Sequence, residues 1–495
     1  MQNDELKSRI FLGRIIEYGL YLLVFLLPWQ TRWIIRAGET EYSAYSLYGT
    51  DILLFVILLL FVVLKCQMSN VKCQTKSKLP ITNYQLPLYW WPIVILDLFV
   101  FISIFFAGDK WLALYKYGWF LLGVGLFWLI TSANYNKIKL FWALLAGIFL
   151  QASLGIYQFL SQSSFASKWL GMALHNPIDL GVSVIETIGS DGVGERWLRA
   201  YGGLDHPNVL GGILTIGLLL VISLIVLKSK CQNPNVKQNP IRQLADKIQN
   251  VFLFSCFFVF LTALFFTFSR GAWVGLLVGI FLLLFIFLIK KNFLKQRELL
   301  KIILAGGILV FFLFNLCNNL VITRLSGNTR LEIKSTEERI ASFSEAKIII
   351  KNNWLLGTGI GNYTLALEKN NPGQESWSYQ PVHNVFLLVW AEVGLLGFLG
   401  FLGFLGFLGW SLAREKNHFG LSILASLVTM MMVDHWYWSL HFGVLWFWLL
   451  GELILTDAGS SGSILTDADS GGLERTAPLC HCEEGVGTTD EAISG

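Results

Sequence analysis

Twelve apolar segments, separated by polar connections, constrain this chain more than any other feature. They run over residues 14–29, 51–64, 89–106, 111–131, 138–160, 207–227, 251–268, 272–289, 302–316, 384–412, 419–433 and 439–455. A helix needs about 20 apolar residues to cross a membrane, and the shorter segments leave room for one re-entrant helix. Of the 495 residues, 54% are hydrophobic and 14% are charged, whereas an average soluble domain has about 25% charged residues. We therefore predict an all-α polytopic membrane protein with about twelve transmembrane helices, and we exclude a water-soluble domain, a disordered chain and a small disulfide scaffold.

The basic residues fall on every second connection between these segments. The second, fourth, sixth, eighth and tenth connections carry Lys65, Lys72, Lys76 and Lys78; Lys137 and Lys139; Lys228, Lys230, Lys237, Arg242 and Lys247; Lys290, Lys291, Lys295, Arg297 and Lys301; and Arg414 and Lys416. Cytoplasmic loops of membrane proteins carry an excess of Lys and Arg. The alternation therefore predicts that both termini are cytosolic and that residues 161–206 and 317–383 are long outer loops.

The second long loop is predicted to be mostly helical. Its stretch Ser335-Thr336-Glu337-Glu338 has the pattern of a capping box, in which the first Ser and the Glu three residues later cap a helix start. Apolar residues then recur at helical spacing as far as Asn352-Asn353. We expect an amphipathic helix of about four turns, followed by a tight glycine turn over residues 357–362.

The rest of the chain offers little chemistry. Residues 1–455 are expected to form the transmembrane domain, and the acidic, Gly/Ser-rich residues 456–495 a disordered cytosolic tail. The tail's Cys480-His481-Cys482 lacks the second half of a four-ligand zinc site, and the seven cysteines have no regular spacing. The Gly-Phe-Leu repeat at 397–409 indicates either helix contact through small residues or repeat slippage in the gene. We predict no metal, no cofactor and no nucleic-acid partner.

Ionisable residues inside the apolar segments are few. Asp97 lies in the middle of its segment, Glu392 about a third of the way into its own, and Asp434 at a segment end. Intramembrane charges commonly mark transport pathways; they also serve as interhelical hydrogen-bond partners. A small-anion transporter using Asp97 and Glu392 is therefore the alternative from another functional class, although the chain shows no internal repeat of the kind many transporters have.

Three other polar residues stand at the outer mouths of three segments. Arg199 precedes the sixth segment, Arg270 lies in the tight turn between the seventh and the eighth, and His383 precedes Asn384, a good helix N-cap, at the tenth. Each has a simpler interpretation, namely a lipid-headgroup contact, a snorkelling side chain or an interfacial histidine. Together, arginines at one depth suit a diphosphate, and a neutral imidazole suits proton removal from a hydroxyl.

At these residues the chain resembles the O-antigen ligase/O-antigen polymerase family of bacterial membrane glycosyltransferases. The resemblance lies in RAYGGLDHPN (199–208), TFSRGAW (267–273), ERIASFSEAKIIIKNNWLLGTGIGNY (338–363) and HNVFLLVWAEVGLLG (383–397). It covers residues 10–455 and is specific mainly between 199 and 397.

The resemblance implies a C-type glycosyltransferase bundle in the bacterial cytoplasmic membrane. It implies transfer of a glycan from an undecaprenyl-diphosphate carrier to an acceptor hydroxyl on a lipid, a glycan or a protein, with inversion and without a metal. Chain polymerisation and protein O-glycosylation are alternatives within the family. Arg199 and Arg270 are expected to hold the diphosphate, and His383 to act as the base or to orient the acceptor. Arg339 and His206 are weaker candidates, because their surroundings match while their roles are less settled.

Overall fold

The computed structural model describes residues 2–74, 90–188, 194–228 and 240–456, and all twelve predicted segments are helical there. These helices are α1 (Gln2–Leu26), α2 (Gly49–Gln74), α3 (Trp90–Ser103), α4 (Lys110–Ser132), α5 (Lys137–Ser161), α6 (Pro207–Lys228), α7 (Pro240–Thr267), α8 (Arg270–Ile289), α9 (Phe293–Leu316), α13 (Val385–Arg414), α14 (His418–Met431) and α16 (His441–Thr456). Among the described residues, eight helices are long and apolar enough to cross a membrane, and three shorter ones are similarly apolar. The chain is thus an all-α polytopic protein. The predicted disordered tail and its Cys-His-Cys fragment lie outside the described residues.

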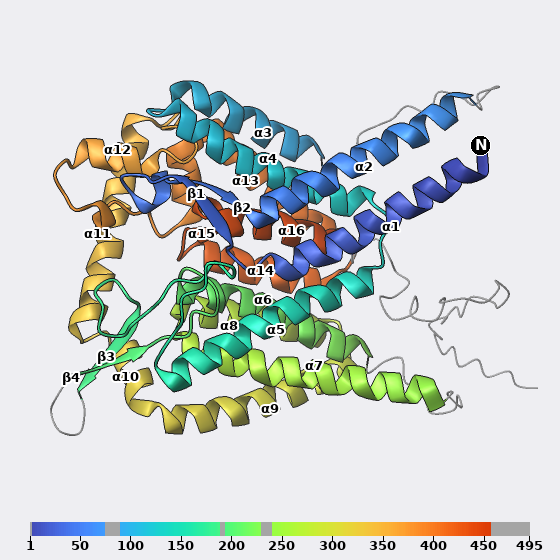
Figure 1. The fold of residues 1–495 in the computed structure, drawn as a ribbon. Coiled ribbons are helices and arrows are strands. Elements are labelled where there is room, and N and C mark those ends of the chain that lie inside the picture. Colours follow the sequence, from blue (N-terminus) through green and yellow to red (C-terminus); the bar gives the residue numbers. More distant parts are fainter. Residues whose placement is uncertain (1, 75–89, 189–193, 229–239, 457–495) are drawn as a thin grey trace, which may run out of the picture.

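The helices run side by side in one bundle, with the long loops gathered at one end (Figure 1, left), here called the loop end. The N-terminus lies at the opposite end. Helix α6 is the centre of the bundle, because nearly all of its residues are buried and it packs against α5, α7, α8 and α14. Its first residue, Pro207, belongs to the predicted site motif 199–208, so the motif lies over the bundle's core.

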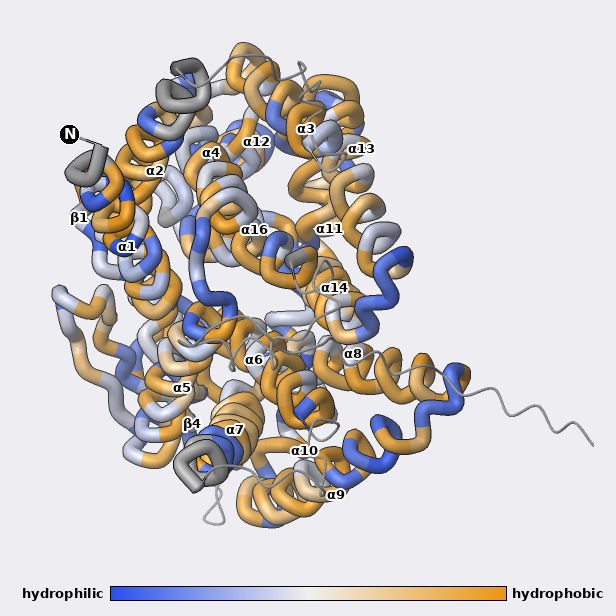
Figure 2. The backbone as a smooth tube through the Cα atoms, turned by 90° about the vertical axis from the view of Figure 1, so that its right-hand side faces the viewer, coloured by the Kyte–Doolittle hydropathy of each residue, from blue (hydrophilic) through white to orange (hydrophobic). Residues whose placement is uncertain are grey.

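The end opposite the long loops collects those basic connections that the structure describes. Asn417, between α13 and α14, donates a hydrogen bond to the Ile454 carbonyl of α16 (3.0 Å). The ammonium of Lys295, at the start of α9, lies 5.6 Å from the Phe419 ring of α14. Viewed from this end, hydrophilic residues mark the connections while the helices between them are hydrophobic (Figure 2). The charge alternation in the sequence therefore corresponds to a real grouping in space.

The long loop before α13 contains three helices, α10 (Asn318–Ser326), α11 (Arg330–Asn352) and α12 (Tyr363–Asn370). The predicted end of the amphipathic helix is confirmed, but the predicted capping box is wrong. Thr329 precedes the first helical residue, and the Thr336 hydroxyl donates to the Glu332 carbonyl within the helix (2.9 Å). The earlier start follows from Gly327, which ends α10 in a left-handed conformation and lets the next helix begin at once.

Two small hairpins at the loop end were not predicted. Strand β1 (Arg32–Arg36) pairs antiparallel with β2 (Tyr45–Tyr48), and β3 (Val184–Ile188) pairs with β4 (Gly194–Leu198). Each strand is at most five residues long and lies in a polar connection, where a search for membrane-length apolar segments does not find it. The β3–β4 hairpin leads straight to Arg199.

Helix α13 is broken near its loop end, and the predicted glycine turn fills the break. Gly394 has φ 73° and ψ −178° within the helix. The freed carbonyls of Ala391 and Glu392 accept hydrogen bonds from the backbone of Thr358 (2.9 Å) and Gly359 (2.8 Å). These bonds tie the large loop to the helix that carries His383 at its start.

We expect Gly394→Ala to destabilise the protein by about 1–3 kcal/mol, because a non-glycine residue is strained at this φ. An added Cβ would also collide with the Leu355 carbonyl. Gly403→Ala, in the same helix with open space around its Cβ, is the control and should be neutral or slightly stabilising. The thermal midpoint of each detergent-purified variant measures the difference, and equal midpoints would contradict the prediction.

Candidate active site

Three helix N-termini meet at the loop end of the bundle. The Asn208 side chain, at the start of α6, donates from Nδ2 to Asp434 Oδ2 (2.9 Å). Asn384 caps α13 by accepting from the Leu387 amide (3.0 Å) and donates from Nδ2 to the Met432 carbonyl (2.9 Å). Arg270 is the first residue of α8 and lines the same cavity as Asn208 and Asp434. Because a helix N-terminus carries partial positive charge, this junction favours an anion.

The turn between α7 and α8 is held in place by two arginines. Arg199 Nε donates to the Thr267 carbonyl (2.7 Å), and Arg324 Nε donates to the Phe268 carbonyl (3.1 Å). Phe268 itself is fully buried with φ 47°. The turn is therefore rigid, and Arg270 begins α8 at a fixed position, as its place in a very short connection predicted.

Arginines surround a small cavity at this junction. Arg270, Arg324 and Arg339 line it together with Asn208 and Asp434. Buried Glu332 of α11 ion-pairs with Arg324 and, at 3.3 Å, with Arg270. With Arg199 behind the cavity wall, four guanidinium groups and the two carboxylates of Glu332 and Asp434 leave two positive charges. That excess matches a diphosphate esterified at both ends, which carries one negative charge on each phosphate.

Arg199 is buried behind Asn208, which lines the cavity. Its Nη2 donates to Asn208 Oδ1 (2.9 Å), so a chain of hydrogen bonds runs from Arg199 through Asn208 to Asp434. Burial, and then the charge of nearby Arg324, lower the pKa of Arg199 below its ordinary value. An anion entering beside these arginines would offset that cost.

His383, Asp434 and His435 form a compact group beside the arginines. His383 Nδ1 lies 3.9 Å from Asp434 Oδ1, and the rings of His383 and His435 are 5.0 Å apart. Burial, followed by the charge of His383, lowers the pKa of His435 to about 3, so His435 stays neutral at physiological pH. Burial alone raises the pKa of Asp434, but the neighbouring imidazoles outweigh it and keep this carboxyl ionised.

The two weaker candidates have different surroundings. Arg339 lines the arginine cavity. His206 lies beside it: its Nδ1 accepts from the Asn208 amide (3.0 Å), and its Nε2 lies 2.9 Å from the Ser183 hydroxyl. Desolvation, together with the charge of Arg199, lowers the pKa of His206 to about 3. His206 therefore orients the start of α6 as a neutral side chain.

Several residues of this group were not predicted from the sequence. Asn208 stood inside a recognised motif, and Asp434 was noted only as a charge at a segment end. Arg324, Glu332 and His435 carried no signal, because they come from separate segments and show no spacing that points to one site.

The two intramembrane carboxylates of the transporter alternative, Asp97 and Glu392, do not line the arginine cavity. Asp97 of α3 accepts a hydrogen bond from Tyr117 of α4 (3.0 Å). Glu392 accepts one from the indole of Trp438 (2.8 Å). Both make interhelical hydrogen bonds, which is the simpler of the two interpretations that the sequence left open.

By donor type and spacing, one set of described residues fits a metal ion. The donor atoms of His383, Asp434 and His435 lie within 4.8 Å of one another. Imidazole and carboxylate are ordinary ligands for transition metals, but His435 already pairs through Nδ1 with the Ser439 hydroxyl (2.7 Å). The expected absence of a metal therefore stays a prediction.

Comparison with known proteins finds a family match for part of this site, while Arg199, Asn208, Asp434 and His435 lie outside the matched stretch. Residues 255–402 match the family described as O-antigen ligase, and this stretch includes Arg270, Arg324, Arg339 and His383. A search of curated proteins gives no match. The chain is a multi-pass membrane protein in which residues 255–402 are similar to the O-antigen ligase family.

Proposed function

We propose that the protein transfers a glycan from undecaprenyl diphosphate to an acceptor hydroxyl at the outer face of the bacterial cytoplasmic membrane. The observation that carries this proposal is the cavity that joins Arg270, Arg324 and Arg339 to Asp434, next to His383. We also propose that both termini are cytosolic, since the helix ends that lead into the basic connections lie at the end of the bundle that holds the N-terminus.

In this reaction the acceptor oxygen bonds to the anomeric carbon while the bond from that carbon to the diphosphate oxygen breaks. The hydroxyl proton passes to His383, and the electron pair leaves on the diphosphate. Asp434 stabilises the imidazolium that forms, and the arginines neutralise the leaving anion. Attack from the face opposite the leaving group inverts the anomeric centre. The lipid tail remains in the bilayer, so the site opens sideways between helices.

Within this site we assign Arg270, Arg324 and Arg339 to the diphosphate. Arg199 and Asn208 position the turn and the carboxylate of Asp434, because their hydrogen bonds reach both. His206 supports the start of α6. The acceptor is a lipid, a glycan or a protein, which distinguishes a ligase from a chain polymerase or a protein O-glycosyltransferase.

Purified protein in lipid nanodiscs, incubated with labelled carrier-linked oligosaccharide and candidate acceptors, tests the proposal. A single addition to lipid or protein supports ligation, and a ladder of products indicates polymerisation. If no labelled glycan were transferred to any acceptor, the result would contradict the proposed glycan transfer. Anion uptake into proteoliposomes that is lost on substitution of Asp97 and Glu392 would support the transporter instead.

We expect transfer to continue in excess EDTA, because guanidinium groups supply the charge that a divalent cation would otherwise supply. The initial rate with and without chelator should agree within about twofold. A rate that disappears with EDTA and returns with added Mg²⁺, Mn²⁺ or Zn²⁺ would show that transfer needs a metal ion, for which His383, Asp434 and His435 are the candidate ligands.

A further inference from the structure

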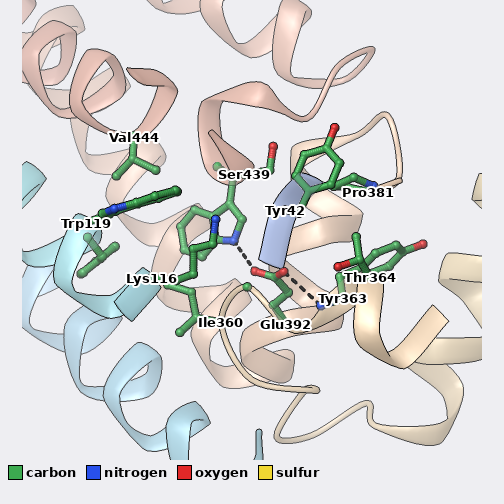
Figure 3. Close-up of a pocket in the computed structure, with 13 residues that line it drawn as sticks. Tyr42, Lys116, Trp119, Ile360, Tyr363, Thr364, Pro381, Glu392, Ser439 and Val444 are labelled. Carbon is green, nitrogen blue, oxygen red and sulfur yellow. Dashed lines mark hydrogen bonds between the residues drawn. The ribbon is translucent and has the colours of Figure 1, made fainter. Parts of the chain in front are cut away.

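A second cavity lies next to the arginine cavity, on the other side of His435. We call it the Lys116 cavity; its polar and aromatic walls include Tyr42, Lys116, Trp119, Thr364, Glu392 and Trp438. Lys116 of α4 and Glu392 of α13 reach into it from opposite sides (Figure 3). The proposed function gives neither residue a role in glycan transfer.

Only a thin wall separates the two cavities. The Tyr42 ring lies 5.8 Å from the ring of His435. Ser439, which also lines the Lys116 cavity, lies 2.7 Å from His435 Nδ1 through its hydroxyl. Pro381, another lining residue, stands two residues before His383. A group held in the Lys116 cavity is therefore next to the proposed base, opposite the arginines.

The cavity holds buried polar groups with unused bonding capacity. Lys116 is only 8% exposed, and its ammonium lies 3.7 Å from the centre of the Trp119 ring. None of the described residues accepts a hydrogen bond from this ammonium. The Thr364 hydroxyl, on a residue that is 2% exposed, has no partner among them either. Leaving such donors unpaired inside a protein is costly, so the cavity is built for polar atoms.

The carboxylate across the cavity is fixed in place. Glu392 is 4% exposed; its Oε2 accepts from the Trp438 indole (2.8 Å), and its Oε1 accepts from the Tyr363 amide (3.3 Å). Each carboxylate oxygen accepts more than one hydrogen bond. A hydroxyl that enters beside Lys116 can thus donate a hydrogen bond to the oriented carboxylate of Glu392. Its oxygen can accept a hydrogen bond from the Lys116 ammonium.

We propose that the Lys116 cavity is the acceptor subsite, which takes the hydroxyl groups along one edge of the acceptor's sugar ring. The assignment rests on the proposed function. A cavity of about 20 Å³ holds one or two groups of water size, since one water needs about 10–15 Å³. The hydroxyls therefore enter while the ring stays at the mouth, where Tyr42 and Trp438 present aromatic surface to its C–H groups. Lys116 donates to the inserted hydroxyls and Glu392 accepts from them.

Steady-state kinetics with both substrates varied separate this role from a merely structural one. We expect Lys116→Met and Glu392→Gln to raise the acceptor KM by about 10- to 100-fold, the effect of losing a charged hydrogen bond. The donor KM and direct binding of the carrier-linked donor should change less than about twofold. The matched controls are exposed Lys110→Met in α4 and exposed Glu375→Gln in the large loop, which should leave both KM values unchanged. An unchanged acceptor KM, or an equal rise for donor and acceptor, would overturn the assignment.

A second variant guards against loss of folding. Thr364→Val keeps the side chain's shape and removes only the unpartnered hydroxyl, so we expect a smaller rise in acceptor KM, about 3- to 10-fold. The thermal midpoint of each variant confirms that it is folded. An acceptor KM of Thr364→Val equal to that of the wild type would contradict a polar contact at this wall.

Saturation-transfer NMR with methyl β-D-glucoside, methyl β-D-galactoside and methyl α-D-mannoside tests binding without the reaction. We expect a saturable signal from at least one glycoside, lost in Lys116→Met and kept in Lys110→Met. No signal from any of the three would overturn the subsite. Sugar binding that depends on Lys116 in a protein that transfers no glycan would overturn the proposed function and leave the subsite standing.

Discussion

Arg270→Lys will lower the rate of glycan transfer by about 10²- to 10³-fold, the loss typical of one group that stabilises a developing anion. The substitution keeps the charge and removes the planar fork of donors. Arg270 contacts Glu332 through Nη2 (3.3 Å) and the Arg324 carbonyl through Nη1 (3.3 Å), while a third of its side chain stays exposed toward the cavity. A lysine ammonium cannot keep those contacts and bind a phosphate in the same geometry.

Arg330→Lys is the matched control for this substitution. Arg330 also lies at a helix start, that of α11 in the large loop, and pairs with a carboxylate, Glu186 (2.7 Å), but its side chain is 70% exposed. Exposed ion pairs contribute little, so transfer by this variant should stay within about twofold of the wild type. Product formation from labelled donor measures both rates, and equal amounts of folded protein in the membrane are the necessary condition. Full activity of Arg270→Lys would remove Arg270 from the site.

The helical bundle was predictable because a membrane imposes a simple rule on sequence. A spanning segment must be long, apolar and helical, and basic residues mark one side. The rule does not extend to the loop end. The start of α11 at Arg330 depends on the left-handed Gly327, and the break at Gly394 depends on backbone donors that come from Thr358 and Gly359.

The site was predictable only where one short segment fixed a side chain by itself. Arg270 begins a helix after a tight turn, and His383 precedes a helix cap, so local sequence placed both. Arg324 and Glu332 meet Arg270 because α10 and α11 fold back over the α7–α8 turn. That contact is tertiary, and no periodicity in the sequence encodes it.

His383→Ala will lower the transfer rate by about 10²- to 10⁴-fold, the range for loss of a positioned general base. His418→Ala, at the opposite end of the bundle, is the control and should stay within about twofold of the wild type. Asp434→Asn should cost about 10²-fold, because the imidazolium loses its neighbouring carboxylate while the side-chain shape is kept.

The double variant decides how these two residues work together. If Asp434 acts through His383, the double variant is no slower than His383→Ala alone, since two members of one unit are not additive. If Asp434 instead acts through Asn208 on the arginine side, the two losses multiply. Initial rates of the four proteins, measured with saturating donor, separate these outcomes. Retained transfer in both His383→Ala and Arg270→Lys would place the chemistry elsewhere. Transfer would then require neither Arg270 at the diphosphate nor His383 at the acceptor hydroxyl.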